Sequence, residues 1–400
     1  MNDLKNYITE RFNGFRLSGG EREKLLKLDK EYGMWFKEWW DKWDRTDCKN
    51  TDSEFKKFIE ARKSGKKYYP QLELVVEKLD ESFIRRGREL QSKFRTFNCF
   101  LSKYYIQNIQ YMIDSSMFTV YGTKDALAVS NHENCPPVPD DLYDAAWKML
   151  REHPYMDVRD QQPHSGPDIV KEMQAHIKKM GYDWHCELNP DMIARQNVVP
   201  NVPVLHIKTD ARFSDIDLAS LKIHEVEVHV ARRHYGLQTG LYLFLDGLYH
   251  RNTVDEGCAI YNSLTKNPMG VKPNLEFDIA IKTVIAKHIM DMDFIELFDW
   301  LVKETKTDQN KDIIEFIVFK NLCRFKRVVK DCSLYGGDAI SESDYFCGYM
   351  LVKDMTDEQR QDLIKYNIGP GQIDELDDIK KFFSINKFKP LSSNDILNLR

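Results

Sequence analysis

Two histidines set five residues apart constrain the fold of this chain more than any other sequence feature. Residues 221–240 read LKIHEVEVHVARRHYGLQTG, so that Glu225 follows His224 directly and His229 lies five positions after it. Residues four apart in a regular α-helix differ by about 40° around the axis, whereas residues five apart differ by about 140°. Both rings could therefore bind one metal ion only if the helix were widened by one residue, as in a π-type bulge. Taken alone, the segment could equally be a polar, solvated helix that binds nothing.

The order of elements indicates a predominantly helical α+β fold with one small antiparallel or mixed sheet. Residues 1–114 have apolar side chains at spacings of three and four, as amphipathic helices do, and Trp35, Trp39, Trp40 and Trp43 form a stripe that we expect to be structural. The expected strands are MFTVYGT (117–123), ALAVS (126–130), DWHCEL (183–188), MIARQNVV (192–199) and PNVPVLHIK (200–208). The helix with the two histidines begins at Ser214 or Asp215, and further helices are expected at 276–304, 310–331, 356–365 and 372–383.

A third candidate ligand lies downstream of the two histidines. In NTVDEGCAIYNSL, Glu256 precedes Gly257 at what looks like the start of a packed helix. A catalytic zinc ion needs three protein ligands, an open position for water and a nearby carboxylate that takes the proton of that water. Two histidines with one glutamate are a known catalytic zinc set, and Glu225 could be the carboxylate. His234, five residues after His229, would need a second distortion of the helix to join the site.

Composition excludes several other kinds of protein. The formal net charge of −5 gives no sign of nucleic-acid binding, and the chain shows no uncharged apolar stretch long enough to span a membrane. The eight cysteines are scattered without a CxxC pair, and the N-terminus has no secretory signal. We therefore expect a cytoplasmic protein with free thiols, whose metal, if present, is held by histidines and carboxylates.

Two segments together resemble a metallopeptidase family that includes the vertebrate microtubule-associated tyrosine carboxypeptidases and the bacterial proteins named for a QEGLA motif. That family pairs an H-E-[VI]-G-T-H helix with a later [QE]-E-G-L-A segment, and the counterparts here are HEVEVH and DEGCA. ARFS (211–214) precedes the helix, ARRHYGLQ (231–238) is similar to the family's L-R-x-x-N-G-L-Q, and GGDAISESDYFCGY (336–349) is a weaker echo. The resemblance covers roughly residues 165–350, and the first hundred residues give no match.

The resemblance implies a zincin-like metallopeptidase domain of the gluzincin type at 115–350, between an N-terminal helical region at 1–114 and a C-terminal helical extension at 351–400 packed on it. It makes His224, His229 and Glu256 the zinc ligands and Glu225 the catalytic base and acid. In this chain Glu227 and Val228 replace the family's Gly-Thr, Asp255 replaces Gln or Glu, and Cys258 replaces leucine. These departures touch no ligand, but they leave the fit of substrate near 227–228 less secure.

The activity that the resemblance implies is zinc-dependent removal of the C-terminal residue of a protein or peptide tail, best known for an aromatic residue after an acidic tail. Arg232 matches a family arginine and could bind the terminal carboxylate bidentately or act on the site through another residue, and Arg212 before the helix is similar. A solvated helix end is the alternative for Arg232. Tyr345 could donate to the oxyanion or simply pack at the core or rim. An extended substrate could add to VLHIK as an edge strand.

Three other functions fit the same residues. A zinc endopeptidase would use the same site with an open groove and no carboxylate-binding arginine. A catalytically silent protein that binds peptide tails would keep the fold without the reaction. A helical scaffold independent of zinc would bind no metal at all.

Overall fold

The computed structural model of the chain describes residues 15–42, 50–73, 80–121, 138–156, 162–192, 194–199, 202–326, 331–337 and 339–399. It is predominantly helical with two small sheets, which confirms the α+β class expected from the sequence. Within these ranges no helix combines the length and the apolar character needed to cross a membrane. The expected strand ALAVS (126–130) and the residue Trp43 lie outside the described residues.

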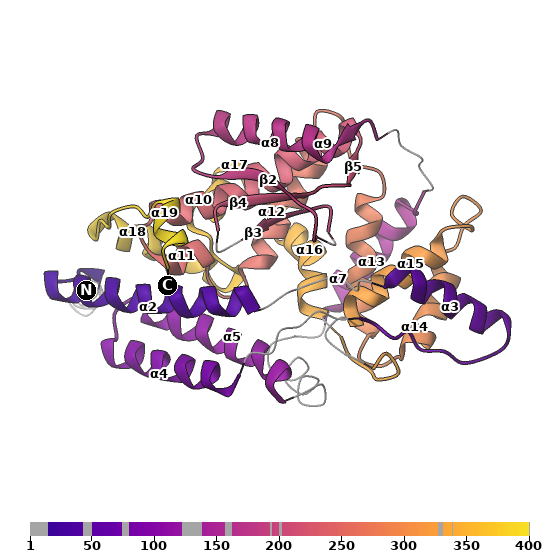
Figure 1. Cartoon of the computed structure of the whole chain (residues 1–400), viewed down its shortest axis with the longest axis horizontal. Coiled ribbons are helices and arrows are strands. Elements are labelled where there is room, and N and C mark those ends of the chain that lie inside the picture. Colours follow the sequence, from indigo (N-terminus) through magenta and orange to yellow (C-terminus); the bar gives the residue numbers. More distant parts are fainter. Residues whose placement is uncertain are drawn as a thin grey trace.

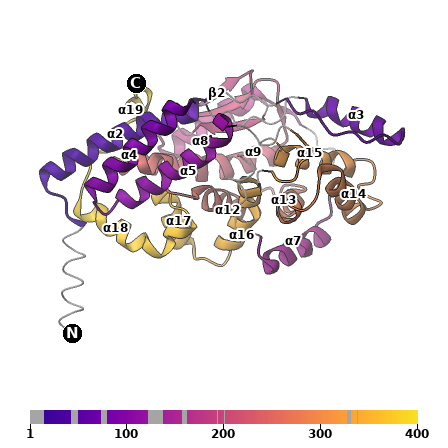
Figure 2. The ribbon, with the colours of Figure 1, turned by 90° about the horizontal axis from the view of Figure 1, so that it is seen from below.

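Four helices open the described chain: α2 (Gly19–Lys42), α3 (Thr51–Lys63), α4 (Glu81–Phe97) and α5 (Ser102–Tyr121). Helices α2, α4 and α5 lie side by side at one end of the molecule, whereas α3 lies at the other end against α15 (Ile314–Lys326) (Figures 1 and 2). The expected strand MFTVYGT is wrong where it is described, because residues 117–121 are the last turn of α5.

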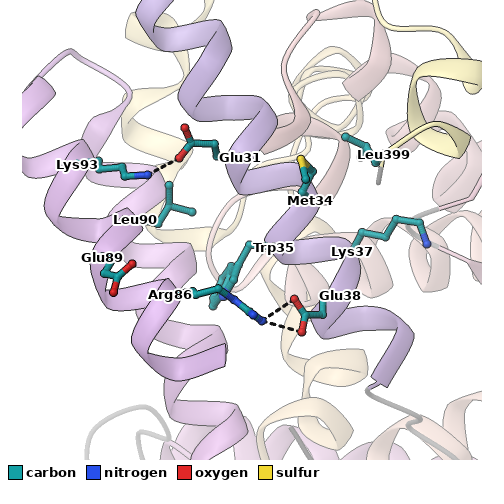
Figure 3. Close-up of a pocket in the computed structure, with 10 residues that line it drawn as sticks. All are labelled: Glu31, Met34, Trp35, Lys37, Glu38, Arg86, Glu89, Leu90, Lys93 and Leu399. Carbon is teal, nitrogen blue, oxygen red and sulfur yellow. Dashed lines mark hydrogen bonds and ion pairs between the residues drawn. The ribbon is translucent and has the colours of Figure 1, made fainter. Parts of the chain in front are cut away.

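The tryptophan stripe of α2 is part of the packed core. Trp35 and Trp39 are buried, and the Trp35 ring stacks on Phe83 of α4 at a centroid distance of 4.5 Å while its indole N–H donates to the Phe83 carbonyl. A groove of about 630 Å³ runs between α2 and α4, and the ion pairs Lys93–Glu31 and Arg86–Glu38 join the two helices along it (Figure 3). Burial of the aromatic rings therefore fixes α2 against α4.

The main sheet has three strands, β2 (His185–Asn189), β3 (Gln196–Val199) and β4 (Val204–Lys208), in the order β2-β4-β3. β2 is parallel to β4 and β3 is antiparallel to it, so the sheet is mixed. VLHIK is β4, the central strand, and the expectation that it would be an edge strand is wrong. The sequence showed the strand but not its partners: β3 pairs with it on one side and β2, which precedes β3 in the chain, pairs with it in parallel on the other.

A second pairing joins β1 (His164–Ser165) to β5 (Arg212–Phe213). In the chain, β1 precedes α8 (Gly166–Met180) and the main sheet, and β5 follows them. Directly after β5 the chain turns into α9 (Asp215–Leu221), η1 (Lys222–Val230) and α10 (Ala231–Gln238) without a break. Ser214 caps α9, and its hydroxyl accepts from the backbone N–H of Asp217, as expected from the sequence.

The remaining elements are helical: α7 (Asp140–Glu152), α11 (Tyr242–Asp246), α12 (Arg251–Thr265), α13 (Leu275–His288), α14 (Phe294–Thr305), α16 (Ala339–Val352), α17 (Asp357–Tyr366), η2 (Pro370–Glu375), α18 (Leu376–Ile385) and α19 (Ser393–Leu397). The single helix expected at 276–304 is wrong, because the chain breaks between α13 and α14. Asp293 ends the break by capping α14, and its Oδ1 accepts from the N–H groups of Ile295 and Glu296.

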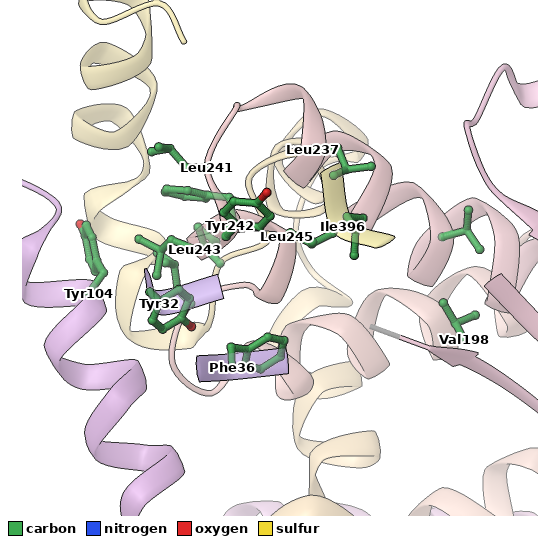
Figure 4. Close-up of a cluster of buried hydrophobic side chains, with 14 of the residues drawn as sticks. Tyr32, Phe36, Tyr104, Val198, Leu237, Leu241, Tyr242, Leu243, Leu245 and Ile396 are labelled. Carbon is green, nitrogen blue, oxygen red and sulfur yellow. The ribbon is translucent and has the colours of Figure 1, made fainter. Parts of the chain in front are cut away.

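Two hydrophobic clusters form the core. The first joins α2, α4 and α5 to the sheet, α10, α11 and the C-terminal helices; part of it is shown in Figure 4. The second joins α7 and α13 to α16 with Phe58 of α3. α12 contributes to both, with Val254 and Ala259 in the first cluster and Ile260 in the second. The glutamate that the sequence singles out, Glu256, therefore lies on the helix that both clusters share.

Candidate metal centre

Residues Lys222–Val230 form a π-helix, η1, inserted between two α-helices. This confirms the widening that the five-residue spacing required. As a result the His224 and His229 rings lie on the same side of the helix, with ring centroids 4.9 Å apart and planes at 72°. A regular helix would have turned the two rings about 140° apart.

Glu256 of α12 completes a cluster of three possible ligands. One ligand atom of each of His224, His229 and Glu256 lies within 4.8 Å of the others, the one group of this kind among the described residues. Glu256 Oε2 is 3.6 Å from His224 Nε2 and 3.8 Å from His229 Nε2. α12 packs directly on η1, which brings together residues that are far apart in the sequence.

Hydrogen bonds on the far side of each ring fix which nitrogen faces Glu256. His229 Nδ1 lies 2.8 Å from Oδ1 of Asp255, a carboxylate, so Nδ1 carries a proton and donates. His224 Nδ1 lies 3.3 Å from the hydroxyl of Ser263, which itself donates to the Ala259 carbonyl and is therefore free to accept. When the rings are neutral, this places the lone pair of each Nε2 atom on the side of Glu256.

The electrostatic field of the cluster favours a cation. Burial alone would lower the pKa of His229, but the carboxylates of Asp255 and Glu256 raise it to about 9. Burial would also raise the pKa of Glu256, yet the two histidines hold it below its usual value. The Glu256 carboxylate and the two imidazole rings attract positive charge to one point. A proton or a metal ion can bind there.

The donor set fits zinc. Glu256 Oε2 is a buried oxygen with no hydrogen-bond partner among the described residues, although it faces both imidazoles. A buried carboxylate oxygen without a partner is costly, and a bound cation would remove that cost. Ligand atoms about 2.0–2.1 Å from a tetrahedral zinc ion lie about 3.4 Å from one another, close to the 3.6 and 3.8 Å found here.

Glu225 lies beside the cluster on the same π-helix. Its side chain is buried, and Oε1 accepts from Gln196 Nε2 of β3 at 3.4 Å. β3, an edge strand of the main sheet, also packs against η1 and so adjoins the candidate centre.

The three residues predicted to bind substrate, Arg232, Arg212 and Tyr345, lie in different surroundings. The Arg232 side chain is 0% exposed and donates to Asn367 and the Ile368 carbonyl, so it faces the interior and not the solvent from which a substrate would come. Its Nε also lies 3.2 Å from Asp255, behind His229. Arg212 is exposed on β5, and Tyr345 of α16 packs under the Lys282 ammonium, 3.6 Å from its ring centre.

Several contacts of the centre were not predicted from the sequence. In the sequence Asp255 stands out only as a replacement in the motif, and no motif marks Ser263 or Gln196. Ser263 is seven residues after Glu256, a spacing that places two side chains on the same helix face, so a signal was available. His234 lies outside the cluster, and its ring packs at a tilt against Tyr182 at a centroid distance of 4.8 Å.

The fold and this cluster define a class: helical α+β proteins with a His–His–Glu group built on a π-helix. The family model of the microtubule-associated tyrosine carboxypeptidases matches residues 56–313, and the chain belongs to this family. It is therefore a peptidase of the carboxypeptidase kind. The match begins at residue 56, well before the start near residue 165 that the resemblance had indicated. It ends before the weaker echo at 336–349. A comparison with curated proteins gives no match.

Proposed function

We propose that the protein is a zinc carboxypeptidase that removes the C-terminal residue of a protein tail. The observation that carries the proposal is the unpartnered Glu256 oxygen facing two imidazole nitrogens, with Glu225 buried alongside. His224, His229 and Glu256 would hold the ion, which leaves one position of a tetrahedral site open. When bound, zinc lowers the pKa of a water ligand and polarises the scissile carbonyl.

Glu225 is the group that moves protons in this proposal. Its carboxylate takes a proton from the attacking water and then gives it to the nitrogen of the departing residue. Gln196 donates to Oε1, which leaves Oε2 for the proton. Since Gln196 lies on β3, the same strand that borders the site also holds the base in position.

The proposed path of the substrate follows β3. Among the described strands β3 pairs only with β4, so its other edge has backbone groups available to an extended peptide. A tail added there would pass Gln196 and so reach Glu225. The family name gives tyrosine as the residue removed and microtubules as the associated structure, so a tyrosine-ended, acidic tail of a microtubule protein is the first substrate to test. We also propose a cytoplasmic location, supported by the six described cysteines, which are all free.

The first test is the metal content of the purified protein and of two variants. We expect about one zinc ion per chain in the wild type and in Glu225→Gln, which keeps all three ligands, and a reduced content in Glu256→Ala. Glu225→Gln should lose turnover while keeping the ion. A wild-type protein without metal in chelator-free buffer would refute the proposal.

The second test is the direction of cleavage. Peptides with free or amidated C-termini are digested and analysed by mass spectrometry, and we expect loss of single C-terminal residues from the free series only. Internal cleavage would make the protein an endopeptidase with the same centre. Binding without cleavage by the metal-loaded wild type would make it a silent tail-binding protein.

A further inference from the structure

We propose that Asn367 is a positioning residue for the metal ligand His229 and that it acts through Arg232 and Asp255. The inference rests on the proposed metal centre. Asn367 lies beyond residue 313, where the match to the family model ends, and at the C-terminal end of α17. It belongs to the segment 351–400 that the sequence marked as a helical extension, so the proposal gives that segment a part in the site.

Every hydrogen-bonding group of the Asn367 side chain is used. Its Oδ1 accepts from Arg232 Nε at 3.1 Å and from Arg232 Nη2 at 2.8 Å. Its Nδ2 donates to the carbonyls of Phe244 at 2.9 Å and Leu245 at 3.3 Å. The residue is 2% exposed and has φ 47° and ψ 48°, a left-handed conformation that asparagine adopts more easily than most residues. Asn367 thus joins α17 to α10 and α11 at one buried point.

Arg232 links Asn367 to the metal ligand His229 through Asp255. Its guanidinium is fully buried, and Nε lies 3.2 Å from Asp255 Oδ1. The same Oδ1 accepts from His229 Nδ1 at 2.8 Å. One carboxylate oxygen therefore contacts both the arginine and the histidine, and a shift of the guanidinium shifts the hydrogen bond that orients the imidazole. Arg233 lies 3.8 Å from the other oxygen of Asp255.

The neutral amide suits this position for an electrostatic reason. Asp255 is buried, and its carboxylate contacts His229 and the guanidinium groups of Arg232 and Arg233. Asn367 binds two N–H groups of Arg232 without cancelling the charge of the guanidinium. The positive charge stays directed at the Asp255 oxygen that accepts from His229. Carboxylates and carbonyls behind a metal-bound histidine fix the ring and tune its basicity.

The test compares two asparagine-to-glycine changes at left-handed positions. Asn367→Gly removes the side-chain contacts with Arg232, Phe244 and Leu245 and suits the left-handed backbone conformation. Asn98→Gly is the control, since Asn98 ends α4 in the same conformation, with φ 48°. The zinc Kd of each purified variant is measured by competition with a chelating dye. We expect a Kd about tenfold weaker for Asn367→Gly and no change for Asn98→Gly.

A double variant tests the route. If Asn367 acts through Asp255, then Asn367→Gly should weaken the zinc Kd in the wild-type background and have no further effect in Asp255→Asn. Equal effects in both backgrounds would overturn the proposed route. If Asn367→Gly does not fold, Arg232→Lys tests the same relay, because an ammonium group cannot bridge Asn367 and Asp255 as the guanidinium does.

The outcomes separate this inference from the proposed function. An Asn367→Gly protein with a lower melting temperature but wild-type zinc affinity would show that the residue only stabilises the fold, and would overturn the inference alone. A wild-type protein that binds no zinc would overturn the metal centre and the inference with it. A metal-free readout is the NMR signal of the His229 Nδ1 proton, which should shift in Asn367→Gly and stay in place in Asn98→Gly.

Discussion

The glycine after Glu256 permits the helix crossing on which the candidate centre depends, so Gly257→Ala should disturb the site more than the fold. A Cβ added at Gly257 would lie 2.3 Å from both the carbonyl carbon and the oxygen of Gly348 in α16, whereas ordinary contact begins at 3.4 Å. The difference means that α12 and α16 would have to separate locally by about 1 Å. Both contact atoms belong to backbone, so no side-chain rotation can relieve the overlap.

The size of the effect follows from two opposing terms. Overpacking costs about 1–3 kcal/mol, and alanine in place of a helical glycine returns up to about 1 kcal/mol. A net loss of about 1–2 kcal/mol would lower the Tm of a 400-residue chain by only about 1–3 °C. Displacing Glu256 by about 1 Å can nevertheless cost about 100-fold in turnover, because reacting groups must be held closely.

The assay measures melting by calorimetry, zinc affinity by competition and kcat/KM on a tyrosine-ended peptide. The matched control is Gly20→Ala, also within a helix, where an added Cβ meets nothing within 4 Å. We expect a small change in Tm and a large loss of activity for Gly257→Ala, and neither loss for the control. A Gly257→Ala protein with wild-type zinc affinity and turnover would refute this account of the crossing.

Two further predictions concern groups near the centre. Burial alone would raise the pKa of Asp217, but Lys272 and Arg195 lower it from 3.8 to about 2, so its contribution to stability is present above about pH 4 and is lost as the pH falls toward 2. Asp217→Asn should remove up to about 2 kcal/mol of this acid-dependent stability in urea titrations, and an unchanged pH slope would contradict it. His234→Phe should keep the zinc content of the wild type, because the His234 ring packs against Tyr182 outside the cluster, and loss of zinc would make His234 a ligand after all.

The sequence predicted what depends on spacing along one helix and missed what depends on neighbours in space. The five-residue interval of His224 and His229 could be turned into a π-helix because helix geometry relates spacing to angle. The burial of Arg232 could not be predicted, since its partner Asn367 lies 135 residues away in the chain. The sequence around Arg232 is the same whether the arginine faces solvent or contacts a carboxylate behind the site.

The position of β4 in the sheet was predicted wrongly for a related reason. β4 reads as a strand from its alternating apolar residues, but its place in the sheet depends on β2 and β3, which pair with it from opposite sides. Strand order is a property of the pairings, and the pattern of a single strand carries little information about it. The break between α13 and α14 was missed because Asp293 reads as one more charge on a helix until its capping hydrogen bonds are seen.

Glu227 gives a final test of which face of the π-helix carries the function. The family has glycine here, and a charged residue at this position had left the fit of substrate in doubt. Glu227 Oε1 instead lies 3.0 Å from His176 Nε2 of α8, so its side chain is directed away from α12 and the ligand cluster. The widened helix is thus held by α8 on one side and by α12 on the other, and neither contact requires glycine.

Restoring the family residue should therefore affect stability and leave the centre intact. Glu227→Gly removes a hydrogen bond worth about 0.5–1.5 kcal/mol and adds about 1 kcal/mol of glycine cost, so we expect the free energy of unfolding to fall by about 1.5–2.5 kcal/mol. Glu227→Ala, which removes the hydrogen bond alone, is the control and should lose less. Zinc affinity and kcat/KM should stay at wild-type values in both. If Glu227→Gly altered zinc affinity while Glu227→Ala did not, then backbone freedom at residue 227 would shape the metal site, and the two faces of η1 would not be independent.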